Sequence, residues 1–359
     1  MDHFPRVGLA HIPEYTRFQE KPKYDEGLYK LGENLFAWMV PNGSWGESNA
    51  GLLIGNGESL LIDTLWDLKY TRCMLEAMAP LIAENPIRTV INTHADGDHW
   101  WGNELVPDAE IIASQKAFEE MQHIKPMSMI LLGKMLGKVL CFIGVKQVGH
   151  WFQNMVIPYD FQEVSPVLPS KTFEGELSLT IGGRHVQLIE VGPAHTQGDV
   201  LVYIPELKTL FCSDILFIGS TPVMWAGPIE NIFAALQKIM QMDVDIFVPG
   251  HGPITDQQGV RNVLSYWEYV HHQAKERYQA GMSAEDAVYD IIFKTDFLSR
   301  PFSQWNSPER MMTNVHILYR QFKGRKDSPK IPELVNILRK QAILAHKLPD
   351  AQPSVMRYR

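Results

Sequence analysis

Six consecutive positions hold two histidines and two aspartates, directly after an apolar run. The run is IRTVINT, residues 87–93, which is typical of a buried strand, and the cluster that follows is HADGDH, residues 94–99. A single histidine or aspartate there is more often structural than a ligand. Several such groups converge at a strand end only where their charge and desolvation are compensated, and a divalent cation does this. The cluster therefore predicts a metal site at the edge of a sheet.

Three further ligand candidates each follow another strand-like run. His195 follows QLIEVGPA, Asp214 follows TLFCS, and His251 follows DIFVPG. Ligands carried on several strand ends at one rim of a sheet form a rigid site, because the scaffold fixes their positions. We therefore expect all three to join the first cluster.

Together these residues resemble the metal-binding motifs of the metallo-β-lactamase-fold hydrolases. The likeness rests on HADGDH, GPAHTQGD, CSD and PGHG and covers about residues 28–255. It implies an αββα sandwich that holds two divalent metal ions between the sheet edges. One metal would take His94, Asp96 and His195, the other Asp98, His99 and His251, and Asp214 would bridge them. Asp98 is also assigned a catalytic role, and Asp63, which ends SLLID, would brace the ligand loop from outside the metal shell.

Asp96 departs from the family pattern, which has histidine at this position. A carboxylate makes the first site harder and more anionic, which favours iron or manganese more than a histidine would. Zinc nevertheless remains the metal that we expect first. Weak occupancy of the first metal site is a further alternative that this change leaves open.

Strand-like and helix-like units alternate from residue 50 onward. Because several strand pairs read as hairpins, we expect an α/β (α+β mixed) fold: two mixed sheets flanked by helices. The sequence predicts helices at 67–84 and 228–242, and hairpins around 56–57, 182–183 and 205–206. The predicted organisation is a main domain, residues 1–255, with a helical extension, residues 256–359, packed on it.

An apolar helical insert is predicted at about 121–155. It is longer than a connection needs, and it is either packed on the body, a homodimer interface, or a lid that forms an apolar wall for the substrate. Lys134 and Lys138 interrupt it, so no stable membrane insertion is expected. Trp45, in PNGSWGESN, and Trp100, which follows the ligand cluster, are predicted to bind substrate.

The net charge of the chain indicates which kind of partner it binds. The formal net charge of −8 disfavours nucleic acid, which is normally bound by a basic surface, and we expect a small-molecule substrate. The three cysteines are widely spaced and odd in number, and the first residues lack an apolar signal-peptide core. The expected compartment is the cytoplasm.

The leading functional hypothesis is a metal-dependent hydrolase that uses a metal-bound hydroxide to cleave a small-molecule ester, lactone, thioester or amide with an apolar moiety. No serine-nucleophile elbow or phosphate-binding glycine loop is present in the sequence. Two alternatives remain open: a di-iron, oxygen-dependent oxidoreductase, which the extra carboxylate favours, and a non-catalytic binding protein.

Overall fold

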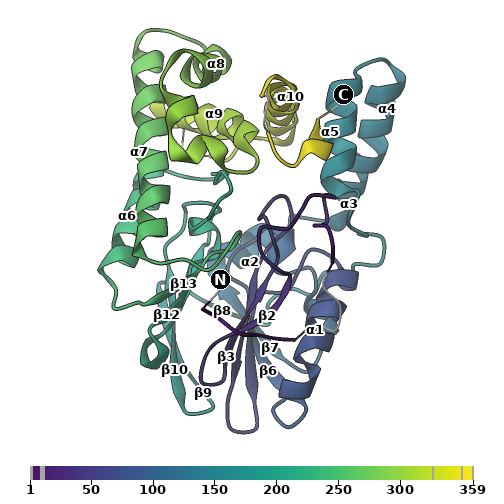
Figure 1. Ribbon diagram of the computed structural model, residues 1–359, viewed down its shortest axis with the longest axis vertical. Coiled ribbons are helices and arrows are strands. Elements are labelled where there is room, and N and C mark those ends of the chain that lie inside the picture. Colours follow the sequence, from purple (N-terminus) through teal and green to yellow (C-terminus); the bar gives the residue numbers. More distant parts are fainter. Residues whose placement is uncertain (1–2, 9–12, 326, 349–350, 358–359) are drawn as a thin grey trace.

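The computed structural model describes residues 3–8, 13–325, 327–348 and 351–357, and the strands within them form two sheets (Figure 1). The eight-stranded sheet follows chain order, antiparallel from β1 to β5 and parallel from β5 to β8. Its strands are β1 (Arg6–Gly8), β2 (Gly27–Gly32), β3 (Leu35–Met39), β4 (Ala50–Ile54), β5 (Ser59–Ile62), β6 (Ile87–Ile91), β7 (Glu110–Ser114) and β8 (Lys171–Phe173).

The second sheet has five strands in the order β13-β12-β11-β10-β9. Its neighbours are antiparallel except β12 and β13, which are parallel. The strands are β9 (Glu176–Ile181), β10 (Arg184–Glu190), β11 (Val200–Ile204), β12 (Thr209–Phe211) and β13 (Ile246–Val248). The three predicted hairpins are present as the pairs β4–β5, β9–β10 and β11–β12.

Successive side chains of a strand point to opposite faces of its sheet, and this produces one apolar layer between the sheets and another outside each sheet. In β11, Val200 and Val202 face the core between the sheets, while Leu201 faces the helices outside. In β4, Leu53 points inward and Leu52 points to the opposite face of its sheet. Because successive strand residues alternate between faces, each sheet buries apolar residues on both sides. The predicted αββα sandwich of two mixed sheets is confirmed.

Helices cover both outer faces (Figure 1). Helix α1 packs on the first sheet through Met74 and Met78, and α6 packs on the second through Ile232 and Leu236. The helices are α1 (Leu68–Ile82), α2 (Gln115–Met121), α3 (Pro126–Met129), α4 (Gly137–Phe142), α5 (Lys146–Val156), α6 (Ile229–Gln241), α7 (Gln257–Gln279), α8 (Ala284–Lys294), α9 (Met311–Phe322) and α10 (Ile331–Lys347).

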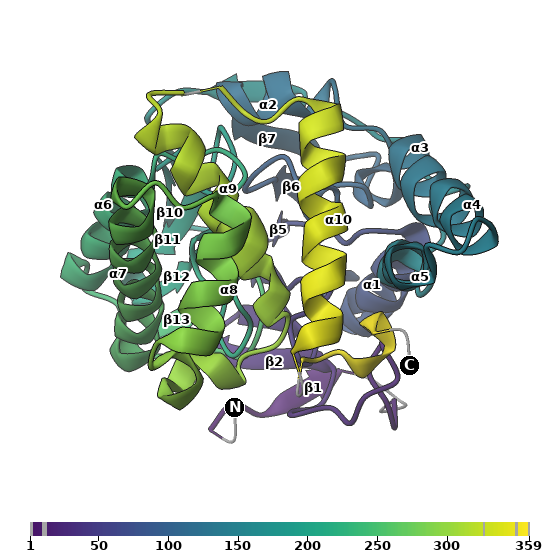
Figure 2. The same ribbon diagram turned by 90° about the horizontal axis from the view of Figure 1, so that it is seen from above.

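The helical extension shares its core with the second sheet. Leu210 of β12, Trp267 of α7 and Leu344 of α10 belong to one buried cluster. Seen from above, α10 runs between the pair α8 and α9 and the insert helices α4 and α5 (Figure 2). The helices of the extension thus pack against the second sheet over a buried apolar core, and the division into two domains at residue 255 stays a prediction.

The insert forms a helical hairpin. Its first arm comprises α3, a π-helical turn (Ile130–Leu136) and α4, and its second arm is α5. Helix α5 packs against α10, and its Trp151 and Phe152 are buried. Within the described residues, no helix is long and apolar enough to cross a membrane.

Candidate metal centre

The ligand candidates lie where chain segments leave the strands. His94 and Asp96 follow β6, and Asp98 and His99 occupy a 3₁₀ turn, Gly97–His99, immediately after them. Asp214 follows β12, and His251 follows β13. His195 lies in the turn between β10 and β11. These strand ends lie together, so the seven side chains predicted from sequence converge.

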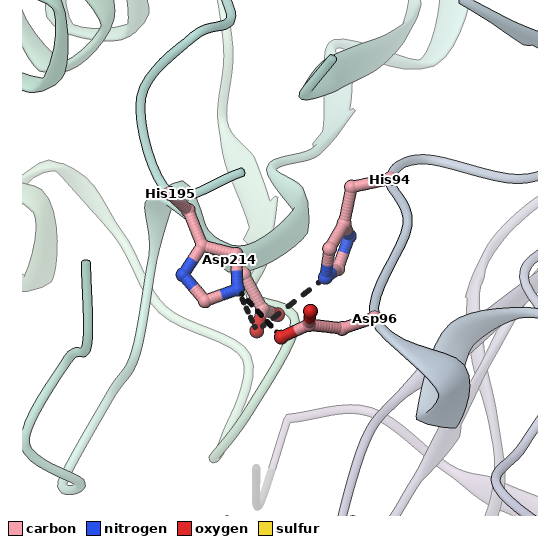
Figure 3. Close-up of side chains that lie close together, drawn as sticks. All are labelled: His94, Asp96, His195 and Asp214. Carbon is pink, nitrogen blue, oxygen red and sulfur yellow. Dashed lines mark hydrogen bonds and ion pairs between the residues drawn. The ribbon is translucent and has the colours of Figure 1, made fainter. Parts of the chain in front are cut away.

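Two groups of side chains in this cluster have the spacing of metal ligands. One comprises His94, Asp96, His195 and Asp214, which Figure 3 shows converging on one point. The other comprises Asp98, His99 and His251. Within each group, the candidate ligand atoms lie within 4.8 Å of one another.

Asp214 is the centre of the cluster. Its Oδ2 lies 3.7 Å from His94 Nε2, 3.3 Å from His195 Nε2 and 3.4 Å from His251 Nε2. Its Oδ1 lies 3.3 Å from His99 Nε2. One carboxylate thus faces all four imidazoles, which is the position a bridging ligand requires.

Asp214 also depends on a glycine in the neighbouring loop. A Cβ atom on Gly250 would lie 1.9 Å from Asp214 Oδ1, so only glycine leaves room for this carboxylate. The close packing of Asp214 therefore explains why the first residue of PGHG is glycine.

Each histidine is oriented by a hydrogen bond at Nδ1, on the side of the ring that faces away from the cluster. His99 Nδ1 lies 2.9 Å from Asp63 Oδ2, His195 Nδ1 lies 2.7 Å from the Val223 carbonyl oxygen, and His251 Nδ1 lies 3.1 Å from that of Glu47. Carboxylate and carbonyl oxygens only accept here, so these Nδ1 atoms donate and the Nε2 atoms face the cluster.

The ring of His94 is oriented in the same way, but by two hydroxyl groups. Its Nδ1 lies 3.0 Å from both Thr93 Oγ1 and Ser213 Oγ. Thr93 donates its own proton to Asp63, 2.8 Å away, and therefore accepts from His94. Asp63 also accepts from the Thr93 backbone N–H at 2.7 Å, so this one carboxylate supports both His94 and His99.

Three atoms that face into the cluster have no hydrogen-bond partner among the described residues. Among the described residues, His94 Nε2, His99 Nε2 and Asp214 Oδ1 are buried and accept or donate no hydrogen bond. Buried polar atoms are normally satisfied, and a bound cation would satisfy these three. The donor set of imidazoles and carboxylates fits divalent metal ions.

The electrostatics of the cluster also favour a cation. Burial, reinforced by the neighbouring His99, lowers the pKa of His94 to about 3. Burial opposes the charged form of His195 too, but the Asp214 and Asp96 carboxylates raise its pKa to about 10. The surplus of carboxylate charge therefore draws positive charge into the cluster.

Asp96 is the ligand candidate most open to solvent, with 29% of its side chain exposed. Its Oδ2 lies 3.1 Å from His195 Nε2 and accepts a hydrogen bond of 3.0 Å from Trp225 Nε1. Trp225 was not singled out from the sequence, because nothing local marks an indole 129 residues away as its partner.

Aromatic rings flank this open side. Trp45 and Trp225 are half-buried with ring centroids 6.3 Å apart, and Trp45 also meets Trp151 of the insert edge-on at 5.8 Å. The guanidinium of Arg310, from the helical extension, lies 4.7 Å from the Trp45 ring centroid. Arg310 was likewise not identified from the sequence.

Trp100 has a different environment. It is fully buried, its Nε1 donates to the Ala95 carbonyl oxygen at 2.8 Å, and it lines a cavity of about 440 Å³ with insert residues such as Met127 and Ile130. That cavity includes none of the seven ligand candidates. The substrate-binding role of Trp100 stays a prediction.

Asp199 fixes the turn that carries His195. Its carboxylate accepts from the backbone N–H groups of Ala194 and Thr196, at 3.1 and 3.0 Å, and from the Thr196 hydroxyl at 2.7 Å. The residue ends the motif GPAHTQGD, so a sequence signal was present, although only the fold shows its use.

Comparisons with known proteins agree with this geometry. The family model of the metallo-beta-lactamase superfamily matches residues 43–251. The chain is 22% identical over 255 residues to the 2,4-dinitroanisole O-demethylase subunit alpha of Nocardioides sp. (strain JS1661), covering 69% of this chain and 66% of that protein. It is 34% identical over 77 residues to a hydroxyacylglutathione hydrolase of Synechococcus sp. (strain JA-3-3Ab), covering 21% of this chain and 30% of that protein.

A solved structure shows the same fold over most of the chain. The sec-alkylsulfatase Pisa1 from Pseudomonas sp. superposes with a TM-score of 0.62 at 14% identity, covering 84% of this chain and 50% of that one. The chain thus spans from under a third to about two thirds of the length of these three proteins.

Proposed function

The chain belongs to the metallo-β-lactamase superfamily, and on this basis we propose that it is a metal-dependent hydrolase of a small-molecule ester, lactone, thioester or amide with an apolar moiety. The observation that carries the proposal is the arrangement around Asp214, where four histidines present Nε2 to one carboxylate. The first metal would be held by His94, Asp96 and His195, and the second by Asp98, His99 and His251, with Asp214 between them.

Divalent cations bound there would acidify water and polarise the oxygen of the scissile group. The chain's own residues hold the surrounding geometry. Burial opposes the charge on Asp98, but His99 and His251 lower its pKa to about 2, so its carboxylate is ionised at neutral pH. As an ionised hydrogen-bond acceptor beside the metals, it would orient the attacking water.

The substrate class follows from the open side of the cluster. Trp225 lies against Asp96 and Trp45 packs beside Trp225, so their apolar rings would contact an alkyl or aryl group of a substrate whose scissile bond faces the metals. Two of the similar proteins carry names that refer to an aryl ether and an alkyl sulfate, which both bear such groups.

Two measurements test the proposal. Elemental analysis of the purified chain should give close to two metal ions per chain, with zinc expected first. Chromogenic esters, lactones, thioesters, aryl sulfates and phosphodiesters should then separate the substrate classes. Asp214→Asn keeps the size of the side chain but removes its charge, and it should abolish turnover and release metal. Full metal content without turnover of any substrate would favour a binding protein instead.

A second candidate function is oxygen-dependent chemistry at a di-iron centre. Asp96 favours it, because a third carboxylate within reach of the metals suits iron or manganese better than zinc. Predominant iron in the elemental analysis, with oxygen consumption in the presence of a reductant, would support it over hydrolysis. We also propose the cytoplasm as the compartment, since Cys73, Cys141 and Cys212 are unpaired thiols.

A further inference from the structure

The first arm of the insert, which we call the outer arm (residues 126–142), has a charge pattern opposite to that of the whole protein. Between Met121 and Tyr159 the sequence contains no aspartate or glutamate, while Lys125, Lys134 and Lys138 lie in or beside the arm and Lys146 begins the next helix. The full chain has a formal net charge of −8. The segment is thus locally basic because it lacks acidic residues, whereas the whole protein is acidic.

The outer arm packs with its small residues inward. A Cβ atom on Gly133 would lie 2.1 Å from Val156 Cγ2, and one on Gly137 would lie 2.9 Å from the Gly149 carbonyl oxygen. Two glycines four residues apart thus allow the arm to approach α5 closely. Helices in water normally bury most of their large apolar residues, whereas this arm also carries a row of them on the face opposite the glycines.

One face of the arm, including residues such as Leu132 and Leu136, packs against the core, but the large apolar side chains on the other face are exposed to solvent. Phe142 is 92% exposed and Ile143, at the tip of the hairpin, is 61% exposed. A stripe along the arm at every fourth position is at least half exposed, comprising Met127, Leu131, Met135 and Val139. In both views the arm lies at the edge of the molecule, on the side of α5 away from α10 (Figures 1 and 2). An exposed apolar stripe of this length marks a binding surface.

We propose that the outer arm docks the protein on the surface of an anionic lipid bilayer. The stripe and the tip residues Phe142 and Ile143 enter the boundary between headgroups and acyl chains, while Lys134 and Lys138 reach the negative headgroups. In this arrangement the arm lies parallel to the membrane surface, within the headgroup region. An apolar face bordered by lysines and free of acidic side chains is complementary to such a surface.

A second copy of the chain matches this face less well. In a two-fold symmetric contact the same patch meets itself, and lysines would face lysines with no carboxylate from this segment between them. The bilayer supplies the opposite charge together with an apolar phase. The proposal is independent of the reaction at the metal centre.

Vesicle co-sedimentation with the full chain tests the proposal. Vesicles of phosphatidylcholine mixed with phosphatidylglycerol should bind the protein, and phosphatidylcholine alone should bind it at least about tenfold more weakly. The double variant Lys134→Gln/Lys138→Gln should weaken binding to the mixed vesicles about tenfold or more. Lys21→Gln/Lys30→Gln removes the same charge from exposed positions outside the insert and should bind as the parent does.

The apolar contribution is tested by Phe142→Ser/Ile143→Ser, which should also lose vesicle binding. These side chains are exposed, so thermal unfolding should match that of the parent. The proposal is overturned if the parent does not bind the mixed vesicles, or if either insert variant binds them as well as the parent. A dimer that Phe142→Ser/Ile143→Ser converts to monomer, without vesicle binding, would assign the face to self-association instead.

Discussion

The indole N–H of Trp225 donates a hydrogen bond of 3.0 Å to Asp96 Oδ2, the side chain at which this protein departs from its superfamily's usual histidine. An indole N–H can only donate, and a carboxylate can only accept when ionised. A histidine bound to metal through Nε2 would present Nδ1–H, a second donor, to the same indole. Asp96 and Trp225 are therefore complementary.

Trp225→Phe should weaken the first metal site. Asp96 is the most exposed ligand candidate, and without the indole its carboxylate would lose the group that orients it. We expect about tenfold weaker binding of one metal ion and little change for the other. Dialysis against graded chelator concentrations, followed by elemental analysis, measures this. Trp305→Phe, in the half-buried part of the extension, is the matched control. Equal retention of both metals by Trp225→Phe and the parent would refute the role.

Asp63→Asn should lower the stability of the fold and weaken metal binding. Asp63 accepts three hydrogen bonds, from the Thr93 backbone, the Thr93 hydroxyl and His99 Nδ1. An asparagine amide has only one oxygen, so at least one donor would face another donor. We expect a loss of about 1–3 kcal/mol in the free energy of unfolding and weaker metal binding. Urea unfolding with and without chelator separates the two effects, and a loss of stability that leaves metal affinity unchanged would show that Asp63 does not support the centre.

Glu47 should make stability depend on pH. Burial raises its pKa to about 8, and its Oε1 has no partner among the described residues. Between its ordinary pKa of 4.5 and about 8, the native state keeps a proton that the unfolded state has lost. The free energy of unfolding therefore falls as pH rises through this window.

Glu47→Gln removes that contribution, so the stability of the variant relative to the parent should rise steadily from pH 4.5 to 8. Urea unfolding at several pH values, in the presence of chelator, gives the comparison. A difference between the two proteins that stays constant with pH would mean that the carboxyl of Glu47 is ionised in the native state.

Trp45→Leu should affect substrate binding more than chemistry. Trp45 lies beside Trp225 on the open side of the cluster, so its loss should raise KM for substrates with aryl groups and leave metal content intact. Trp100→Phe is the informative comparison, because Trp100 is buried behind the ligand loop. If Trp100→Phe raises KM while Trp45→Leu does not, the substrate enters from the cavity beside the insert.

Much of the fold follows from local patterns. Short continuous apolar runs predict strands such as β4 and β11, and Asn56-Gly57 and Gly182-Gly183 mark turns between antiparallel partners. The candidate ligands are visible for the same reason, since each follows an apolar strand. His94, Asp214 and His251 occur in short motifs whose chemistry can be read without knowing what lies across the sheet.

The sequence by itself predicted mixed sheets flanked by helices, a helical extension and the seven ligand candidates, because apolar strand runs, turn chemistry and ligand spacing all act over a few residues, and the resemblance of its motifs implied the sandwich. Only the tertiary structure decided that Trp225 holds Asp96, that Arg310 reaches the ring of Trp45, and that Gly133 and Gly137 let the outer arm approach α5 closely. These relationships join groups that meet only after folding. A hydrogen bond or ring contact of this kind depends on close approach in space, and it leaves no periodic trace in the chain.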